Sequence, residues 1–206
     1  MKLFITGIST NVGKTITAAI LTEALEADYW KPIQAGDLQN SDSNKIGALI
    51  SNSKTVIHRE SYALTLPASP HLSAKHDGIQ IDTKQIIEPA TANHLIIEGA
   101  GGILVPLNDS ETIADLIRPD YKVVVVSRNY LGSINHTLLT IEALRNRNVL
   151  FAGIIFSGES TVSSEEIILA KSGLQCLGRI EQEPYFDKNV IAEYAAQFRD
   201  TLLKLQ

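Results

Sequence analysis

Short apolar runs alternate with longer amphipathic stretches along this chain. The apolar runs occupy 3–6, 29–33, 94–97, 122–127, 151–156 and 177–180, and they have the length of buried strands. Apolar residues recur every three or four positions from Gly13 onward and over 134–147, 163–172 and 188–205, which predicts helices. Strands that alternate with helices imply right-handed crossovers between parallel strands. We therefore predict an α/β fold, a single domain over 1–206 with a doubly wound, mostly parallel sheet flanked by helices.

Glycine-rich and polar segments follow the first three predicted strands. These segments are 7–15, 31–42 and 98–102. In doubly wound sheets, ligands bind in the crevice beyond the carboxyl ends of the strands. We therefore expect the three segments to form one binding site.

The first segment has the order of a phosphate-binding loop: a strand, a glycine-rich turn, Gly13-Lys14-Thr15 and a helix. In such a loop, backbone N–H groups bind phosphate, the lysine reaches the terminal phosphates and the hydroxyl binds Mg²⁺. Five residues, 8–12, separate the two glycines, where the usual pattern has four. A chance Gly-Lys-Thr is the alternative, but the flanking strand and helix favour a P-loop NTPase. We expect the nucleotide to contact Asn11, Val12, Gly13, Lys14, Thr15 and Ile16.

Carboxylates in the other two segments are candidate magnesium ligands. Mg²⁺ beside phosphates takes hard oxygen ligands, usually a hydroxyl with one or two carboxylates. Thr15 supplies the hydroxyl. Glu98 ends an apolar strand, where a carboxylate is costly to bury without a cation, although a helix or turn cap is the alternative. Asp42 could bind the metal, cap a helix that starts at Ser43, or do both.

Two further features belong to this expected site. Lys31, at the end of the second strand, could stabilise developing negative charge or could be a solvated strand-end lysine, and chemistry alone leaves both open. The glycine-rich run after Glu98 lets the backbone approach a ligand closely. This adds Gly99, Ala100 and Gly101 to the expected nucleotide contacts.

Composition and charge restrict the class of protein. The 44% hydrophobic and 20% charged residues are typical of a globular protein, and the net charge of −5 argues against non-specific nucleic-acid binding. The single cysteine, Cys176, excludes an internal disulfide and is expected to be buried. No apolar run approaches the roughly 20 residues of a membrane span, and Met-Lys directly precedes a strand. We expect a cytoplasmic protein without nucleic-acid or membrane partners.

Six stretches of the chain together resemble the dethiobiotin synthetase family. They are TGISTNVGKT (6–15), WKPIQAG (30–36), NSD (40–42), ASPH (68–71), IEGAGG (97–102) and LGSINH (131–136), in the family's order. The long phosphate loop is the form that this family uses. The Trp-Lys-Pro and Leu-Gly-x-Ile-Asn-His segments are specific, whereas Gly-Lys-Thr alone is not.

The resemblance implies an ATP- and Mg²⁺-dependent ligase of biotin biosynthesis. Its substrate is 7,8-diaminopelargonic acid, one amine of which takes up CO₂ to form a carbamate. The carbamate attacks the γ-phosphate of ATP, and the second amine then closes the ring to give dethiobiotin, ADP and phosphate. Charge repulsion between anions dominates such a barrier, so cations matter most.

The resemblance also implies a role for individual residues. Catalytic roles fall to Lys31, Lys14 and Thr10, and Mg²⁺ ligation to Thr15, Asp42 and Glu98. Substrate contacts fall to Ala35, Gly36, Ser69 and Pro70, and to Gly132, Ser133, Ile134 and Asn135 at a helix start of the neighbouring subunit in a homodimer. Helix capping is the alternative for Ser133 and Asn135.

The chain departs from the family pattern at two places. Ala35 stands where a Ser or Thr commonly contacts substrate, so a hydrogen bond worth about 0.5–1.5 kcal/mol is lost. Ser157-Gly158 stands where the family has an Asn that reads the adenine edge, and no proline follows Ile180. We still expect Ser157 and Gly158 to contact the nucleotide, but one hydroxyl cannot offer the paired donor and acceptor of an amide.

Three other functions compete with this interpretation. Cobyrinic or cobyric acid amidating enzymes share the loop, but 206 residues leave no room for their glutamine-hydrolysing domain. A partition-type ATPase would carry a second lysine early in the loop, where this chain has Ile8 or Ser9. A catalytically silent nucleotide-dependent partner switch stays possible on sequence alone.

The departure at Ser157 predicts weak discrimination between nucleotides. We expect similar kcat/KM values for ATP, GTP and CTP, because no amide is present to read the adenine edge. Steady-state kinetics with each nucleotide measures this, and a strong preference for ATP over both others would contradict it.

Overall fold

A parallel sheet forms the centre of the computed structural model, which describes residues 1–205. Its seven strands lie in the order β4-β2-β6-β1-β7-β8-β9, and every neighbouring pair is parallel. They are β1 (Lys2–Gly7), β2 (Asp28–Trp30), β4 (Ile57–His58), β6 (Leu95–Gly102), β7 (Lys122–Arg128), β8 (Leu150–Ser157) and β9 (Cys176–Ile180). All six predicted strands are present, and the additional strand β4 is too short to give a periodic signal.

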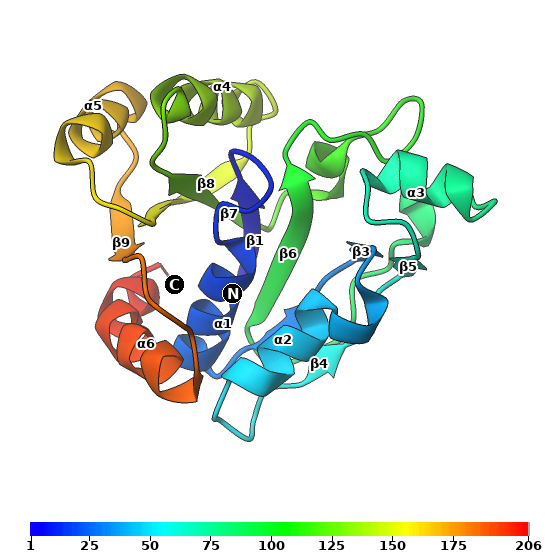
Figure 1. Ribbon diagram of the computed structural model, residues 1–206, viewed down its shortest axis with the longest axis horizontal. Helices are drawn as coiled ribbons and strands as arrows, with labels where there is room; N and C mark the ends of the chain where they lie inside the picture. The colour runs from blue at the N-terminus through cyan, green and yellow to red at the C-terminus, as the bar shows by residue number, and fades with distance from the viewer. Residues whose placement is uncertain (206) are drawn as a thin grey trace.

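Helices cover both faces of this sheet. The helices of the chain are α1 (Lys14–Leu25), α2 (Asp42–Leu49), α3 (Pro70–His76), α4 (Ser133–Arg145), α5 (Val162–Ser172) and α6 (Lys188–Leu203), of which α3 packs on the small sheet of β3 (Ile33–Ala35) and β5 (Tyr62–Leu64) instead. Figure 1 shows α4 and α5 together on one side of the sheet and α1 and α6 on the other. The predicted doubly wound α/β fold is therefore confirmed.

Among residues 1–205, no helix combines the length and the apolar character needed to cross a membrane.

The second predicted strand is divided into two. β2 ends at Trp30, and β3 (Ile33–Ala35) begins after Lys31-Pro32 and pairs instead with β5 (Tyr62–Leu64) in a separate two-stranded sheet. Proline has no N–H to donate to a ladder, so a break at Pro32 has a direct physical cause. As a result, Lys31 lies directly beyond the carboxyl end of β2 rather than inside a strand.

The chain changes direction across the sheet at β1. The strands β2, β4 and β6 lie on one side of β1, and β7, β8 and β9 lie on the other. Such a reversal leaves a crevice beyond the carboxyl ends of the central strands, where ligands of this fold class bind. The loop between β1 and α1 occupies this position.

The strand β6 is longer than predicted. Ile5 pairs with Glu98, and Gly7 then pairs with Gly102, so two residues of β1 run beside four of β6. This bulge contains Gly101, whose φ of +68° lies in the left-handed region that favours glycine. The glycine-rich run thus continues the strand, and Glu98 lies within the sheet rather than at its end.

One cysteine prediction is wrong. Cys176 is the first residue of β9, as expected of a strand start, but its side chain is exposed. The reason is that β9 is an edge strand, with a neighbour on one side only.

The core itself follows the predicted apolar runs, and Val123, Val124, Val125 and Val126 are fully buried.

Candidate nucleotide and metal site

The loop that links β1 to α1 is folded tightly by glycines. A Cβ added at Gly7 would lie 2.5 Å from Cγ2 of Val12, and Gly13 has a φ of +94°. No side chain caps the N-terminus of α1, whose first residue is Lys14. Its free N–H groups and the helix dipole therefore favour an anion at this point.

Lys14 folds back over this loop. Its Nζ donates to the carbonyl oxygen of Ser9 at 2.9 Å, and its side chain is almost fully buried. Burial disfavours the charged amine and lowers the pKa of Lys14 to about 8, with a further contribution from the charge of Lys31. A phosphate bound nearby would favour the charged form and supply a negatively charged partner in addition to the carbonyl of Ser9.

Glu98 is the centre of a buried hydrogen-bond network. Its carboxylate is 1% exposed and accepts from the Thr15 hydroxyl at 2.9 Å, the Tyr29 hydroxyl at 2.8 Å and Nζ of Lys31 at 3.2 Å. Burial, followed by the charge of Glu98, raises the pKa of Tyr29, so this phenol stays a donor. Glu98 is therefore not a turn cap, and its charge is compensated by a neighbouring cation.

Lys31 bridges two carboxylates. Its Nζ lies 2.5 Å from Oδ2 of Asp42 and 3.2 Å from Oε1 of Glu98. Burial alone would lower the pKa of Lys31, but the charges of Glu98 and Asp42 outweigh it and raise the pKa. The alternative of a solvated strand-end lysine is wrong, because only 6% of the side chain is exposed.

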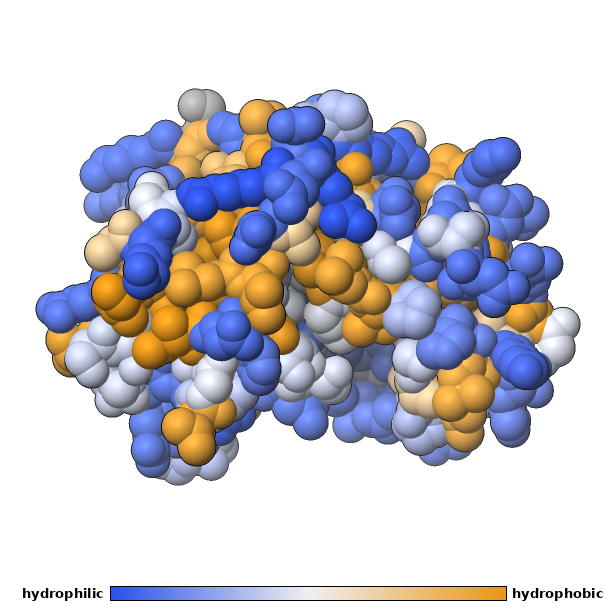
Figure 2. Space-filling view, turned by 90° about the horizontal axis from the view of Figure 1, so that it is seen from above, coloured by the Kyte–Doolittle hydropathy of each residue, from blue (hydrophilic) through white to orange (hydrophobic). Residues whose placement is uncertain are grey.

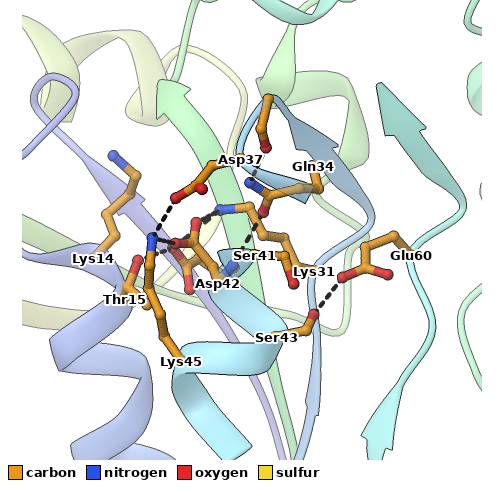
Figure 3. A network of polar contacts seen from close by, with 12 residues as sticks. Lys14, Thr15, Lys31, Gln34, Asp37, Ser41, Asp42, Ser43, Lys45 and Glu60 are labelled. Atoms are coloured by element: carbon orange, nitrogen blue, oxygen red, sulfur yellow. Dashed lines mark hydrogen bonds and ion pairs between the residues drawn. The ribbon is translucent and has the colours of Figure 1, made fainter. Parts of the chain in front are cut away.

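Asp42 is the first residue of α2 and not its cap. The cap is Ser41, whose hydroxyl accepts from the backbone N–H of Asn44 at 3.2 Å. The Asp42 carboxylate instead receives Lys31 on one oxygen and Lys45, at 3.3 Å, on the other, as Figure 3 shows. Burial raises the pKa of Asp42, but the lysines, chiefly Lys31, outweigh this and lower it, so the carboxylate is ionised.

The donor set fits a magnesium ion. Thr15, Asp42 and Glu98 offer one hydroxyl and two ionisable carboxylates, joined through Lys31 and through the bond from Thr15 to Glu98. Over residues 1–205, no three His, Cys, Asp or Glu side chains gather as an independent metal site. A cation here would therefore depend on phosphate oxygens and water for its remaining ligands, as Mg²⁺ at nucleotide sites does.

A cleft of about 1050 Å³ opens over these groups. Its lining includes most of the predicted site residues: Thr10, Asn11, Gly13, Lys14, Thr15, Ile16, Lys31, Ala35, Asp42, Ser69, Pro70, Glu98, Ala100, Gly101, Ser157 and Gly158. Thr10 lies beside the bulge, because a Cβ at Gly101 would come 3.7 Å from its hydroxyl. The three segments expected to form one site thus meet at one cleft.

Three predicted contact residues are placed elsewhere. Val12 is buried, and its carbonyl oxygen accepts from the Ser157 hydroxyl at 2.7 Å. Gly36 forms a turn in which its N–H donates to Leu64 and its carbonyl accepts from Gln34. Gly99 lies within β6 and does not line the cleft. The carbonyl of Val12 and both backbone groups of Gly36 are thus paired within the protein, and Gly99 is part of the sheet.

The predicted substrate residues Gly132, Ser133, Ile134 and Asn135 do not line the cleft of their own chain. They form the start of α4, where Gly132 has a φ of +101° and no side chain caps the helix. The capping alternative for Ser133 and Asn135 is therefore wrong, and the N–H groups of this helix start are left without a side-chain partner.

Sequence reasoning missed several residues of the site. Tyr29 lies two positions before Lys31, so period-two alternation places both on one side of the extended chain. Lys45 lies three positions after Asp42, on the same face of α2. These two spacings were available signals, whereas Arg128, a lining residue from the end of β7, has no local signal at all.

Four features together define a P-loop nucleotide-binding protein. They are the parallel sheet, the tight loop after β1, the uncapped start of α1, and the acid–lysine cluster, which consists of Lys31, Asp42 and Glu98. A family model described as an AAA domain matches residues 1–190. Solved structures share the fold: a plasmid partition protein from Borrelia burgdorferi, with TM-score 0.59 and 16% identity over 98% of each chain, and the cell-division ATPase MinD from Pyrococcus furiosus, with TM-score 0.59 and 11% identity over 100% and 99% of the chains. At these identities the likeness concerns the fold alone.

Curated relatives identify the family. ATP-dependent dethiobiotin synthetases from Christiangramia forsetii and Cytophaga hutchinsonii are 54% and 50% identical, over 98% and 97% of both chains. The enzyme of that name from Agrobacterium fabrum is 40% identical over 96% of this chain and 93% of its own. The chain belongs to the ATP-dependent dethiobiotin synthetase family.

The hydroxyl of Tyr29 is expected to stabilise the fold through Glu98. Tyr29→Phe removes one donor from a buried carboxylate, which should lower the free energy of unfolding by about 1.5–3 kcal/mol, the range for a hydrogen bond to a charged group. Urea denaturation measures this. Tyr185→Phe, at an exposed position, is the matched control. Equal stability of the two variants would contradict the role given to Tyr29.

Proposed function

We propose that this chain closes the ureido ring of dethiobiotin, joining 7,8-diaminopelargonic acid and CO₂ at the expense of ATP. The observation that carries the proposal is the position of Lys31, a buried cation held by Asp42 and Glu98 beside an uncapped phosphate-binding helix. Membership of the dethiobiotin synthetase family supplies the substrate and the reaction, and the chain is accordingly assigned as a ligase of biotin biosynthesis.

The reaction needs positive charge at one point. The carbamate and the γ-phosphate of ATP are both anions, so their approach is opposed by repulsion. Lys14 and Lys31 are buried amines at the cleft, where low solvent exposure strengthens electrostatic stabilisation. We infer that Lys14 holds the terminal phosphates and that Lys31 stabilises charge on the reacting oxygens.

The residues present also fit Mg²⁺ as the partner of ATP. Thr15, Asp42 and Glu98 would hold the ion, which supplies positive charge beside the phosphates when bound. Asp42 is available for this role because Ser41 already caps α2.

The diamine is assigned to the part of the cleft on the Lys31 side. This part is lined by Thr10, Gln34, Ala35, Ser69, Pro70 and Val105. Ser69 is the N-cap residue of α3, but its hydroxyl makes no capping hydrogen bond. Ala35 offers no side-chain hydrogen bond, which leaves Thr10 and Ser69 as hydroxyl candidates for polar contacts with the substrate.

We further propose a homodimer in which α4 of one subunit completes the substrate site of the other. Figure 2 shows apolar side chains gathered on the face that α4 and α5 present. Leu131, just before α4, is fully exposed, and Leu139 on α4 is half exposed. A second subunit packed on this face would remove the apolar surface from water. It would also bring the uncapped start of α4 to the substrate carboxylate of the other subunit.

The cytoplasmic location stays a prediction from the sequence.

The function is tested by incubating the purified protein with diaminopelargonate, bicarbonate and Mg-ATP and assaying dethiobiotin and ADP. Lys31→Ala should lower turnover by about a hundredfold or more, the loss seen when one group that stabilises developing charge is removed. Lys171→Ala, on the exposed face of α5, should keep the full rate.

Loss of Lys31 also leaves the buried Glu98 carboxylate without its cation and Asp42 with Lys45 alone, so the fold of the variant must be checked by circular dichroism. Lys31→Arg retains the charge and serves as a second variant that is expected to fold. Near-normal turnover of folded Lys31→Ala would overturn the role of Lys31. Absence of dethiobiotin from the unchanged protein would overturn the proposed function.

The dimer predicts a linked loss of assembly and activity. Leu131→Asp should place a charge in the interface, shift the protein toward monomers in analytical ultracentrifugation and reduce dethiobiotin formation. Ile87→Asp, at another exposed apolar side chain, is the control and should change neither. A monomeric protein with full activity would contradict a substrate site shared between subunits.

A further inference from the structure

Arg128 is a cation of the cleft to which the proposed reaction gives no role. It is the last residue of β7, so it lies on the opposite side of β1 from β6 and Glu98. Its side chain lines the cleft together with Ser157, Gly158, Ile180, Glu181, Gln182, Glu183 and Phe186. It is therefore separated from the acid–lysine cluster by the phosphate-binding loop.

The guanidinium group is held from three segments of the chain. Nη1 donates to the carbonyl oxygen of Asn11 at 3.3 Å, and Nη2 donates to Oε1 of Gln182 at 3.0 Å. The stem lies against Gly158, where an added Cβ would come 3.2 Å from Nε of Arg128. Gly158 also has a φ of +78°, a backbone conformation that favours glycine, and a Cβ here would press on the stem of Arg128.

Arg128 is exposed to the cleft, and the hydrogen bonds of its guanidinium come from the two terminal nitrogens. Hydrogen bonds from a guanidinium lie close to its plane, and both terminal nitrogens are engaged at the edge. The flat faces of the group can then accept an aromatic ring by stacking and by cation–π attraction.

The position of a bound nucleotide follows from the rest of the cleft. The start of α1 fixes the phosphates, and the acid–lysine cluster on the β6 side fixes the reacting end. The nucleoside then extends toward the β7–β9 side, where Arg128 is the one cation among the described lining residues. The Ser157 hydroxyl is not free to donate to a base, because it donates to Val12.

We propose that Arg128 lies flat against the nucleobase of the bound nucleoside triphosphate. Every base has an aromatic face, so stacking of this kind tolerates different bases. It would give affinity without selecting adenine, in keeping with the absence of an amide at Ser157. The inference rests on the proposed function only as far as ATP occupies this cleft.

The experiment compares two ligands that differ by the nucleoside. Isothermal titration calorimetry measures the Kd of Mg-ATP and of magnesium tripolyphosphate for the unchanged protein and for Arg128→Ala. We expect the Kd of ATP to rise roughly five- to tenfold, since stacking and cation–π contacts contribute on that order, and the Kd of tripolyphosphate to stay unchanged. Arg147→Ala, an exposed arginine bonded to Ala143 on the C-terminal side of α4, is the control and should alter neither.

A second variant separates charge from shape. Arg128→Lys retains the positive charge but loses the plane, so it should bind ATP nearly as weakly as Arg128→Ala. Recovery of ATP binding in Arg128→Lys, or an equal loss of ATP and tripolyphosphate binding in Arg128→Ala, would overturn the proposal in favour of a charge effect or of support to the loop through Asn11. Unchanged ATP binding by Arg128→Ala would overturn it outright.

These outcomes are independent of the ring-closing reaction. Failure of the proposed function would appear as normal ATP binding by the unchanged protein without formation of dethiobiotin. Failure of the present inference would appear in the binding of Arg128→Ala, whatever the protein does with ATP.

Discussion

The ion bridge from Lys31 to Asp42 and Glu98 is the interaction on which the site depends. It joins three segments that follow β2, start α2 and lie within β6, and both Lys31 and Glu98 are buried. Buried charges are tolerated only when they are paired, because removal of one partner leaves a charge without solvent or counter-ion at a cost of about 3–5 kcal/mol. Burial opposes both charged forms, but the pairing outweighs it: the pKa of Lys31 is raised and that of Asp42 is lowered, so both keep the charge that a phosphate and a metal ion require.

The sheet topology explains why these groups meet beside a phosphate loop. The chain builds β2, β4 and β6 on one side of β1 and β7, β8 and β9 on the other, so the loop after β1 faces the crevice between the two halves. The β6 side carries the acids and the lysine, and the β7–β9 side carries Arg128 and the Gly158 turn. One cleft thus has one end lined by the acids and lysines and an opposite end lined by Arg128 and the Gly158 turn.

Fold and family give different kinds of information about this chain. The partition and cell-division ATPases share its sheet and loop at 16% identity or less, which concerns architecture only. Specific chemistry is carried by the sequence relatives, at 40–54% identity over nearly the whole chain. The same scaffold is therefore shared by a plasmid partition protein, a cell-division ATPase and a family of ATP-dependent synthetases, so the fold alone does not fix the function.

The sequence by itself determined the strands, the main helices, the phosphate loop and the family, because these depend on local periodicity and on short motifs. It also placed Lys31, Asp42 and Glu98 at one edge of the sheet. Only the tertiary structure decided that Ser41 rather than Asp42 caps α2. It also decided that the Tyr29 hydroxyl donates to the Glu98 carboxylate and that Arg128 donates to Asn11 and Gln182. The contacts of Tyr29 and Arg128 join residues far apart in the chain, so no local pattern records them. Ser41 and Asp42 are both residue types that cap helices, so the local sequence does not choose between them.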